Sequence, residues 1–244
     1  MSKSTLSETS IIDPTERSEE QNIIKNEKIS NQEQISPPTI KGFEKWRLSL
    51  SNFTGLGLSE EEKEQNKLEK DWDKCESWKK NLMERSPMIV FLLDHLRKSG
   101  CEFNSSSIQC HPCPESRSGG FSKDHGILLC QNRFFNKKHL EDTLSHELLH
   151  AFDECKFKVD WLNLRHHACS EIRAANLSGD CRWTREVKRG FYSFNKQHQA
   201  CVKRRAILSV IANPSCKSPE MAEKAVNEVW ESCFKDTRPF DEIY

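Results

Sequence analysis

The chain has 244 residues with 37 basic and 37 acidic side chains, so its formal net charge is zero. This balance argues against a protein that coats nucleic acid, because phosphate binding needs a clustered positive excess, and no nucleic-acid partner is expected. The mean hydropathy is −0.76, and the longest apolar run, 88–93, is too short to span a membrane. An integral membrane protein is therefore excluded, whereas peripheral attachment is not.

The first 57 residues are predicted to form a disordered or poorly ordered tail, followed by one folded domain over residues 58–244. Residues 1–42 hold no aromatic residue and are rich in Ser, Glu, Asn and Gln, so they cannot bury enough apolar surface to offset the entropy of ordering. An amphipathic segment begins at Phe43 and includes Trp46. It is interpreted either as a segment that docks on the domain or as one that contacts a membrane surface.

Two helices are predicted at the start of the domain. Ser59 is a typical N-cap, and three glutamates follow it where the helix dipole favours negative charge. Leu68, Cys75 and Leu82 then recur at helical spacing. Pro87 is expected at the first position of a second helix, since proline is well accommodated there.

The rest of the domain is predicted to combine further helices with a small sheet. Residues 101–125 are expected to be mostly loop. The predicted elements after residue 100 are a short β-hairpin over 119–130 and helices over 140–154, 168–177 and from Ser218 onward. The fold class that follows is α+β and helix-dominated.

Eleven cysteines lie in the chain, all of them after residue 74. Three interpretations are open: disulfides in an oxidising compartment, metal ligands in a reducing one, or unrelated buried thiols. The only C-x-x-C pair is Cys110 with Cys113, and a zinc ribbon needs a second pair. The scattered spacing favours disulfides between helices, with at least one cysteine left over. A structural zinc module centred on Cys110 and Cys113 remains the alternative.

Residues 146–150 read His-Glu-Leu-Leu-His, which is the H-E-x-x-H motif. On a helix, His146 and His150 share one face, so both imidazoles can reach one Zn²⁺. Glu147 lies beside the metal in such a motif, where it acts as general base and acid on water and the leaving amine. A leucine stripe on another side of the same helix is expected to pack in the core. The motif predicts a zinc hydrolase with Glu147 catalytic and a zincin-like fold.

A zinc ion that keeps one position for water needs a third protein ligand. The candidates are Asp153, His166, His167 and Glu171. Glu171 lies on its own predicted helix, and a glutamate from a second helix completes the site in one large branch of zinc peptidases. That branch usually has an aspartate four residues later, where this chain has Ala175. Glu171 is the predicted third ligand, and Asp153 is expected to orient a ligand or cap the helix.

Other residues are candidates for contacting substrate or for a purely structural role. His166 and His167 are interpreted as groups that polarise the substrate carbonyl or as structural residues, and His198 and Tyr192 are weaker candidates. The strand over 127–130 is either the edge along which a substrate strand is added or an ordinary core strand.

Several segments of the domain resemble one known family. They are Gly-Gly-Phe at 119–121, Thr-Leu-Ser-His-Glu-Leu-Leu-His-Ala-Phe-Asp-Glu-Cys at 143–155, Ala-Cys-Ser-Glu-Ile-Arg-Ala-Ala-Asn-Leu-Ser-Gly-Asp-Cys at 168–181, and Glu-Val-Trp-Glu-Ser-Cys-Phe at 228–234. They are similar to the mitochondrial intermembrane-space metalloproteases that mature subunit 6 of ATP synthase and assist assembly of its membrane sector.

The resemblance implies zinc bound by His146 and His150 and a catalytic Glu147. It implies a protein substrate, the precursor of an ATP synthase membrane subunit, and a peripheral position on the mitochondrial inner membrane, facing the intermembrane space. Some cysteine-rich proteins enter that space without a cleavable presequence and are trapped by oxidative folding, which agrees with the disulfide interpretation. The alternative function is a non-catalytic assembly chaperone for ATP synthase on the same scaffold.

Overall fold

The computed structural model describes residues 59–114, 117–192 and 196–240 of the chain. The chain divides into two units, 1–57 and 58–244, and every described residue belongs to the second. The predicted tail and the amphipathic segment that includes Trp46 lie outside the described residues and stay predictions.

The described domain is an α+β fold dominated by helices, as predicted. Its elements in chain order are α3 (Glu60–Arg85), α4 (Pro87–Lys98), β1 (Ile108–His111), β2 (Gly119–Ser122), β3 (Gly126–Cys130), α5 (Lys137–Phe157), α6 (Leu164–Leu177), α7 (Trp183–Lys188), α8 (Gln197–Ile211) and α9 (Pro219–Phe234), with 3₁₀ turns at Ser105–Ser107 and Gln131–Arg133.

The helix starts follow the local capping chemistry. Ser59 forms a capping box with Glu62, in which each side chain accepts a hydrogen bond from the other residue's backbone N–H. Pro87 opens α4, as predicted. The helix that carries the H-E-x-x-H motif begins earlier than predicted, because Asn136 caps it by accepting from the backbone N–H of His139.

The three strands form one sheet in the order β1-β3-β2. The predicted hairpin is confirmed, since β2 pairs antiparallel with β3 and Gly119 lies opposite Leu129. The strand β1 was not predicted, and it pairs parallel with β3. The strand β3 is therefore bonded on both sides and cannot accept an added substrate strand. Within the part of the chain that the structure describes, the free edge nearest the motif helix belongs to β2.

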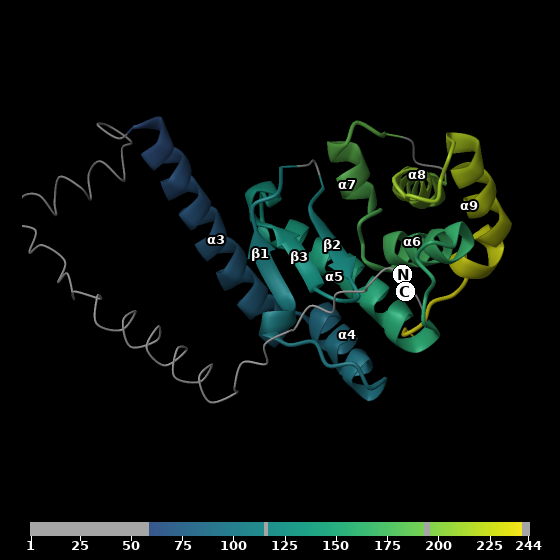
Figure 1. The fold of residues 1–244 in the computed structure, drawn as a ribbon, viewed down its shortest axis with the longest axis horizontal. Coiled ribbons are helices and arrows are strands. Elements are labelled where there is room, and N and C mark those ends of the chain that lie inside the picture. Colours follow the sequence, from purple (N-terminus) through teal and green to yellow (C-terminus); the bar gives the residue numbers. More distant parts are fainter. Residues whose placement is uncertain (1–58, 115–116, 193–195, 241–244) are drawn as a thin grey trace, which may run out of the picture. The chain divides into compact units, whose positions relative to one another are not determined.

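Two apolar clusters build the core. The first joins α3, α4, the sheet and one side of α5, and it includes the predicted stripe Leu140, Leu144 and Leu148. The second joins α6, α8 and α9. Figure 1 shows α5 beside the sheet and α6 between α5 and the pair α8 and α9. The helices α5 and α6 meet where the two clusters adjoin, and they carry the motif and Glu171.

Five disulfides cross-link this domain, which confirms the disulfide interpretation. The pairs are Cys75–Cys110, Cys101–Cys155, Cys113–Cys130, Cys169–Cys233 and Cys181–Cys201. Cys216 is the remaining cysteine and is free. Because Cys110 and Cys113 belong to two different disulfides, neither is a thiolate that can bind zinc. The alternative of a structural zinc module centred on them is wrong.

Candidate active site

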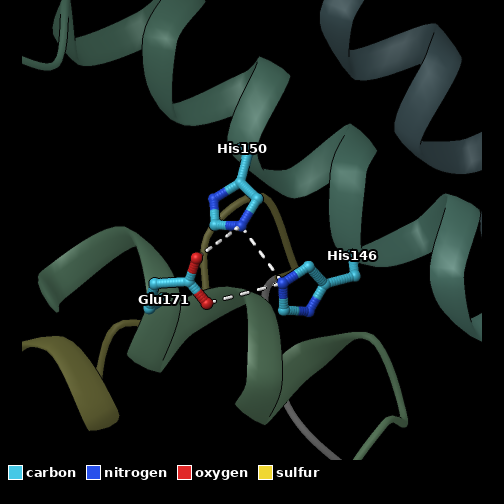
Figure 2. A group of neighbouring side chains, drawn as sticks. All are labelled: His146, His150 and Glu171. Carbon is cyan, nitrogen blue, oxygen red and sulfur yellow. Dashed lines mark hydrogen bonds and ion pairs between the residues drawn. The ribbon is translucent and has the colours of Figure 1, made fainter. Parts of the chain in front are cut away.

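The two histidines of the motif converge with Glu171 at the contact between α5 and α6. Figure 2 shows the rings of His146 and His150 leaving successive turns of α5 toward the carboxylate of Glu171 on α6. The two Nε2 atoms lie 3.1 Å apart. Glu171 lies 3.6 Å from Nε2 of His146 and 3.4 Å from Nε2 of His150. All three residues are buried, between 5% and 8% exposed.

These spacings suit a tetrahedral zinc ion. Ligand nitrogen and oxygen atoms about 2.0–2.1 Å from a tetrahedral centre lie ~3.3 Å from one another. The three observed separations, 3.1, 3.4 and 3.6 Å, are close to that value. Two imidazoles and one carboxylate are also a donor set that zinc hydrolases use, with a fourth position left for water. The residues present therefore fit zinc.

A chain of hydrogen bonds orients His150. Its Nδ1 lies 2.8 Å from Ser170 Oγ, and that hydroxyl donates to Asp153 Oδ2 at 2.9 Å. Since the hydroxyl proton goes to Asp153, Ser170 accepts from the Nδ1–H of His150, and the lone pair of Nε2 faces Glu171. Asp153 is held by Arg173 at 3.0 Å. Asp153 thus lies where an orienting residue was predicted, one hydroxyl away from the imidazole.

The imidazole of His146 lacks this kind of support. Its Nδ1 is buried and has no hydrogen-bond partner among the described residues. The two histidines of the motif are therefore held unequally, His150 by a hydrogen-bond chain and His146 by packing.

Glu171 is held as an anion by groups from three directions. Burial raises the pKa of its carboxyl, but His150, His146 and His167 outweigh burial, and the pKa lies well below its usual value. Ser209 on α8 donates to Oε1 at 2.7 Å. Fixed in this way, the carboxylate presents an oxygen toward each histidine of the motif.

His167 contacts Glu171 but is not one of the three converging groups. The amide nitrogen of Asn213 donates to its Nδ1 at 2.8 Å, so the ring proton is on Nε2, which lies 3.4 Å from Glu171 Oε1. His166 instead is exposed, and its Nδ1 accepts from the backbone N–H of Asp160. The sequence left these two neighbouring histidines equivalent, and the structure separates them.

The other weak candidates lie outside the site. His198 contacts Asn176 Oδ1 at 2.7 Å and the carbonyl of Cys181, and it is a structural residue. Tyr192 is 74% exposed. Neither lines the cleft that contains the converging histidines.

Glu147 is a buried residue of α5 on the side of the helix that faces β2. Burial raises the pKa of its carboxyl to about 7, and the nearby Glu171 adds to the rise while His150 opposes it. The backbone of Gly119 passes directly over it. A methyl group at Gly119 would lie 2.8 Å from Thr143 Cγ2 and 3.3 Å from Glu147 Oε1, so the strand approaches this closely only because the residue is glycine.

A cleft of about 1060 Å³ runs along this site. One wall is β2, the floor is α5, and the opposite side is formed by α7 and α8. At one end lie the aromatic rings of Phe121 and Trp161, whose centroids are 6.0 Å apart. Trp161 is also edge-on to His150. The cleft borders the free edge of β2 within the described part of the chain.

Three supporting residues escaped the sequence reasoning. Ser170 and Ser209 hold His150 and Glu171, and Arg173 holds Asp153. Ser170 immediately precedes Glu171, so its hydroxyl next to a candidate ligand could have marked it as a supporting residue. Ser209 had no such signal, because it lies 38 residues from Glu171 on a helix that was not predicted.

Comparison with known proteins decides the family. The model of the peptidase M76 family matches residues 73–241, which is more than half of the chain. This chain is a member of peptidase family M76.

Its relatives include proteins named mitochondrial inner membrane protease ATP23 in three fungi. The one in Eremothecium gossypii is 49% identical over 93% of this chain and 99% of its own length. The one in Saccharomyces cerevisiae strain S288c is 50% identical over 83% of this chain and 96% of its own length. The one in Malassezia globosa is 56% identical over 69% of this chain and 76% of its own length.

Membership of M76 makes this chain a protease with a protein substrate, associated with the mitochondrial inner membrane, as the resemblance implied. No described helix is long and apolar enough to cross a membrane. No solved structure matches the chain.

Proposed function

We propose that this M76 protease is a zinc metalloendopeptidase in which His146, His150 and Glu171 hold zinc and Glu147 is the catalytic base and acid. The observation that carries the proposal is the convergence of two Nε2 atoms and a carboxylate within 3.6 Å, beside a buried Glu147. Asp153 and Ser170 position His150, and His167 and Ser209 position Glu171.

His146, His150 and Glu171 would hold the zinc, which would act there as a Lewis acid toward the substrate carbonyl and would lower the pKa of water to about 7. Because a neighbouring cation favours the ionised carboxylate, Glu147 beside an occupied metal site accepts a proton from water near neutral pH. The same carboxyl then returns the proton to the leaving amine. The burial of Glu147 excludes bulk water that would otherwise compete for this proton.

The substrate is held as an added strand on β2. Among the described residues, the edge of β2 away from β3 has no strand partner, and Gly119, Gly120 and Phe121 line the cleft. A peptide bonded to that edge places one of its carbonyl groups over the converging ligands. Strand addition gives affinity through main-chain hydrogen bonds, and the pockets of the cleft then select side chains.

The substrate of this chain is the precursor of an ATP synthase membrane subunit, and the chain also aids assembly of the proton-translocating sector from the intermembrane-space side. Support for this step comes from the segments at 143–155 and 168–181, which resemble the family with that role. The five disulfides support an oxidising compartment.

The test is Glu147→Gln in the full oxidised chain. The variant is expected to keep its fold and its zinc and to lose cleavage of the precursor by at least ~100-fold, because only the proton transfer is removed. Unchanged cleavage would refute the mechanism. In cells that lack the protein, assembly of ATP synthase restored by Glu147→Gln would assign assembly to the scaffold rather than to cleavage.

A further inference from the structure

One end of the cleft carries a concentration of basic side chains. This basic end lies beyond His146, where α7 and α8 face the first turns of α5. The basic side chains that line it include Lys138, Arg182, Arg185, Lys188, Arg189 and Arg205. The opposite end of the cleft is aromatic, with Phe121 and Trp161.

The acidic residues at the basic end neutralise it only in part. Lys138 also pairs with Glu141 at 2.5 Å and Arg189 with Glu186 at 3.0 Å, but these cations share their other carboxylates. Three guanidinium groups, from Arg185, Arg189 and Arg205, share the single carboxylate of Asp180 at 3.2, 2.8 and 2.5 Å. A second carboxylate, Asp142, is likewise shared by several cations. They are Lys138 at 3.3 Å, Arg182 at 3.7 Å and Arg185 at 3.0 Å.

Lys188 adds a charge with no partner. Its side chain is exposed on α7, it lines the cleft, and it forms no ion pair within the described part of the chain. It is therefore free to pair with a ligand at no loss of an existing contact. Exposed charges of this kind act mainly on selectivity and on the rate of encounter.

The directions of two pKa shifts agree with the excess of positive charge that the ion pairs show at this end. Burial raises the pKa of Asp180, but Arg205, His146, Arg189 and Arg185 outweigh it and hold the pKa at about 2. Burial lowers the pKa of His139 to about 4, and Arg185 is the next largest cause. A cation is disfavoured at this end of the cleft and an anion is favoured.

The direction of β2 decides which part of a peptide meets the basic end. Gly119, at the start of β2, lies over Thr143 and Glu147 on α5. Phe121, near its end, lies beside Trp161 at the aromatic end. The strand therefore runs from the basic end toward the aromatic end. A peptide added antiparallel to β2 runs the other way, so the residues after its scissile bond lie at the basic end.

We propose that the basic end of the cleft is a specificity subsite for acidic side chains in the first few residues after the scissile bond. Lys188 and Arg182 supply its exposed cations. This proposal rests on the proposed peptidase function and names the substrate class of the same site. A carboxylate-bearing segment is favoured there, and a basic segment is repelled by the same charges.

Binding tests the subsite without catalysis. The probe is a fluorescent alanine-based peptide with glutamates in its C-terminal half, compared with the same peptide carrying glutamines, both added to the zinc-loaded Glu147→Gln chain. The glutamate peptide should bind more tightly, and Lys188→Glu should weaken it about fivefold. The difference should shrink in ~1 M salt. Equal binding of the two peptides, or a preference that survives Lys188→Glu, would overturn the proposal.

The matched control is Lys224→Glu, because Lys224 is also an exposed helical lysine but lies on α9, outside the cleft. It should leave the preference unchanged. Cleavage sites mapped in a peptide library should show Asp and Glu enriched after the cut, and Lys188→Glu should remove the enrichment. A chain that binds the glutamate peptide selectively but cuts nothing would refute the peptidase function alone, whereas unselective cutting would refute the subsite alone.

An anionic membrane is the competing ligand for such a basic surface. Vesicles of phosphatidylcholine mixed with cardiolipin distinguish the two. If Lys188→Glu lowers vesicle binding and leaves the peptide preference intact, the basic end is a lipid-contact surface and the proposal is wrong. If it lowers the peptide preference and leaves vesicle binding intact, the subsite is supported.

Discussion

Ser170 is the residue through which the buried pair of Asp153 and Arg173 acts on the candidate metal site. Its hydroxyl accepts from His150 and donates to Asp153, so it fixes which nitrogen of the imidazole carries the proton. Arg173 in turn donates to the backbone carbonyls of Asp236 and Arg238. The orientation of the candidate ligand His150 is thereby linked to the segment that follows α9.

Ser170→Ala should weaken zinc binding about tenfold, because His150 loses the acceptor that fixes its ring and tautomer. Zinc affinity is measured by competition with a chromogenic chelator. Ser170→Thr keeps the hydroxyl and should recover most of the affinity. Zinc affinity unchanged in Ser170→Ala would show that the hydrogen-bond chain does not support the metal site.

His139 makes the stability of the domain depend on pH. Its pKa is about 4 in the folded protein against an ordinary 6.5, so the unfolded chain binds the proton more tightly. The stability that comes from keeping this ring neutral is complete above pH 6.5 and is lost as the pH falls from 6.5 toward 4. The loss is roughly 2 kcal/mol, below the full value of the shift because the ring lines an open cleft.

His139→Gln should therefore flatten the fall in unfolding free energy between pH 6.5 and 4, measured by urea denaturation at several pH values. The control is His125→Gln, at the exposed hairpin turn, and it should keep the slope of the original chain. If the unfolding free energy fell equally steeply with pH in the original chain and in His139→Gln, His139 would not be the source of the pH dependence.

The pattern of the sequence predicts some of the site residues better than others. The i, i+4 spacing places His146 and His150 on one face of any helix, so their proximity follows from local geometry alone. Glu171 could be nominated by its residue type and helix, but its approach to α5 depends on how α6 packs. Ser209 could not be found, because its helix has no side-chain cap and begins at a left-handed Lys196.

At the scale of elements, β2 lies close against α5 at Gly119. Gly119 allows it, since a side chain there would meet Thr143 and the carbonyl of Leu128 at 2.8 and 3.0 Å. The hairpin itself was predicted from its turn residues. The strand β1 was not, because it has only four residues within a segment rich in Ser and Cys and gains its pairing from β3.

Gly119→Ala should lower peptide cleavage at least ~10-fold while the domain keeps its zinc, because β2 must move away from Glu147. Gly120→Ala is a matched control, since a methyl group at Gly120 meets nothing within 4 Å. The measurement is cleavage rate at equal zinc content. Equal rates in the two variants would show that the position of β2 over Glu147 does not matter.

At the scale of the whole domain, each disulfide stays within one part of the core, whereas the candidate metal site lies where the two parts meet. The cluster around α5 and the cluster around α8 and α9 are distinct, and the candidate ligands come from both sides of their boundary. Cys169–Cys233 ties α6 to α9 and closes 64 residues, whereas Cys113–Cys130 closes 17. The cysteine count predicted cross-linking, but the pairing required the packed structure.

Replacing both cysteines of Cys169–Cys233 with alanine should lower the free energy of unfolding by about 4 kcal/mol, and the same change at Cys113–Cys130 by about 3 kcal/mol, because the longer loop restricts the unfolded chain more. Urea denaturation of the oxidised proteins measures both. A larger loss for the shorter loop would contradict the loop-length argument.

The zinc content of the purified, oxidised chain tests the central claim most directly, measured beside a His146→Ala/His150→Ala double variant whose fold is verified by circular dichroism. The account predicts about one zinc per chain in the original protein and none in the folded double variant. One zinc retained in the double variant would contradict it, because the metal would then be held by residues other than the two histidines of the motif.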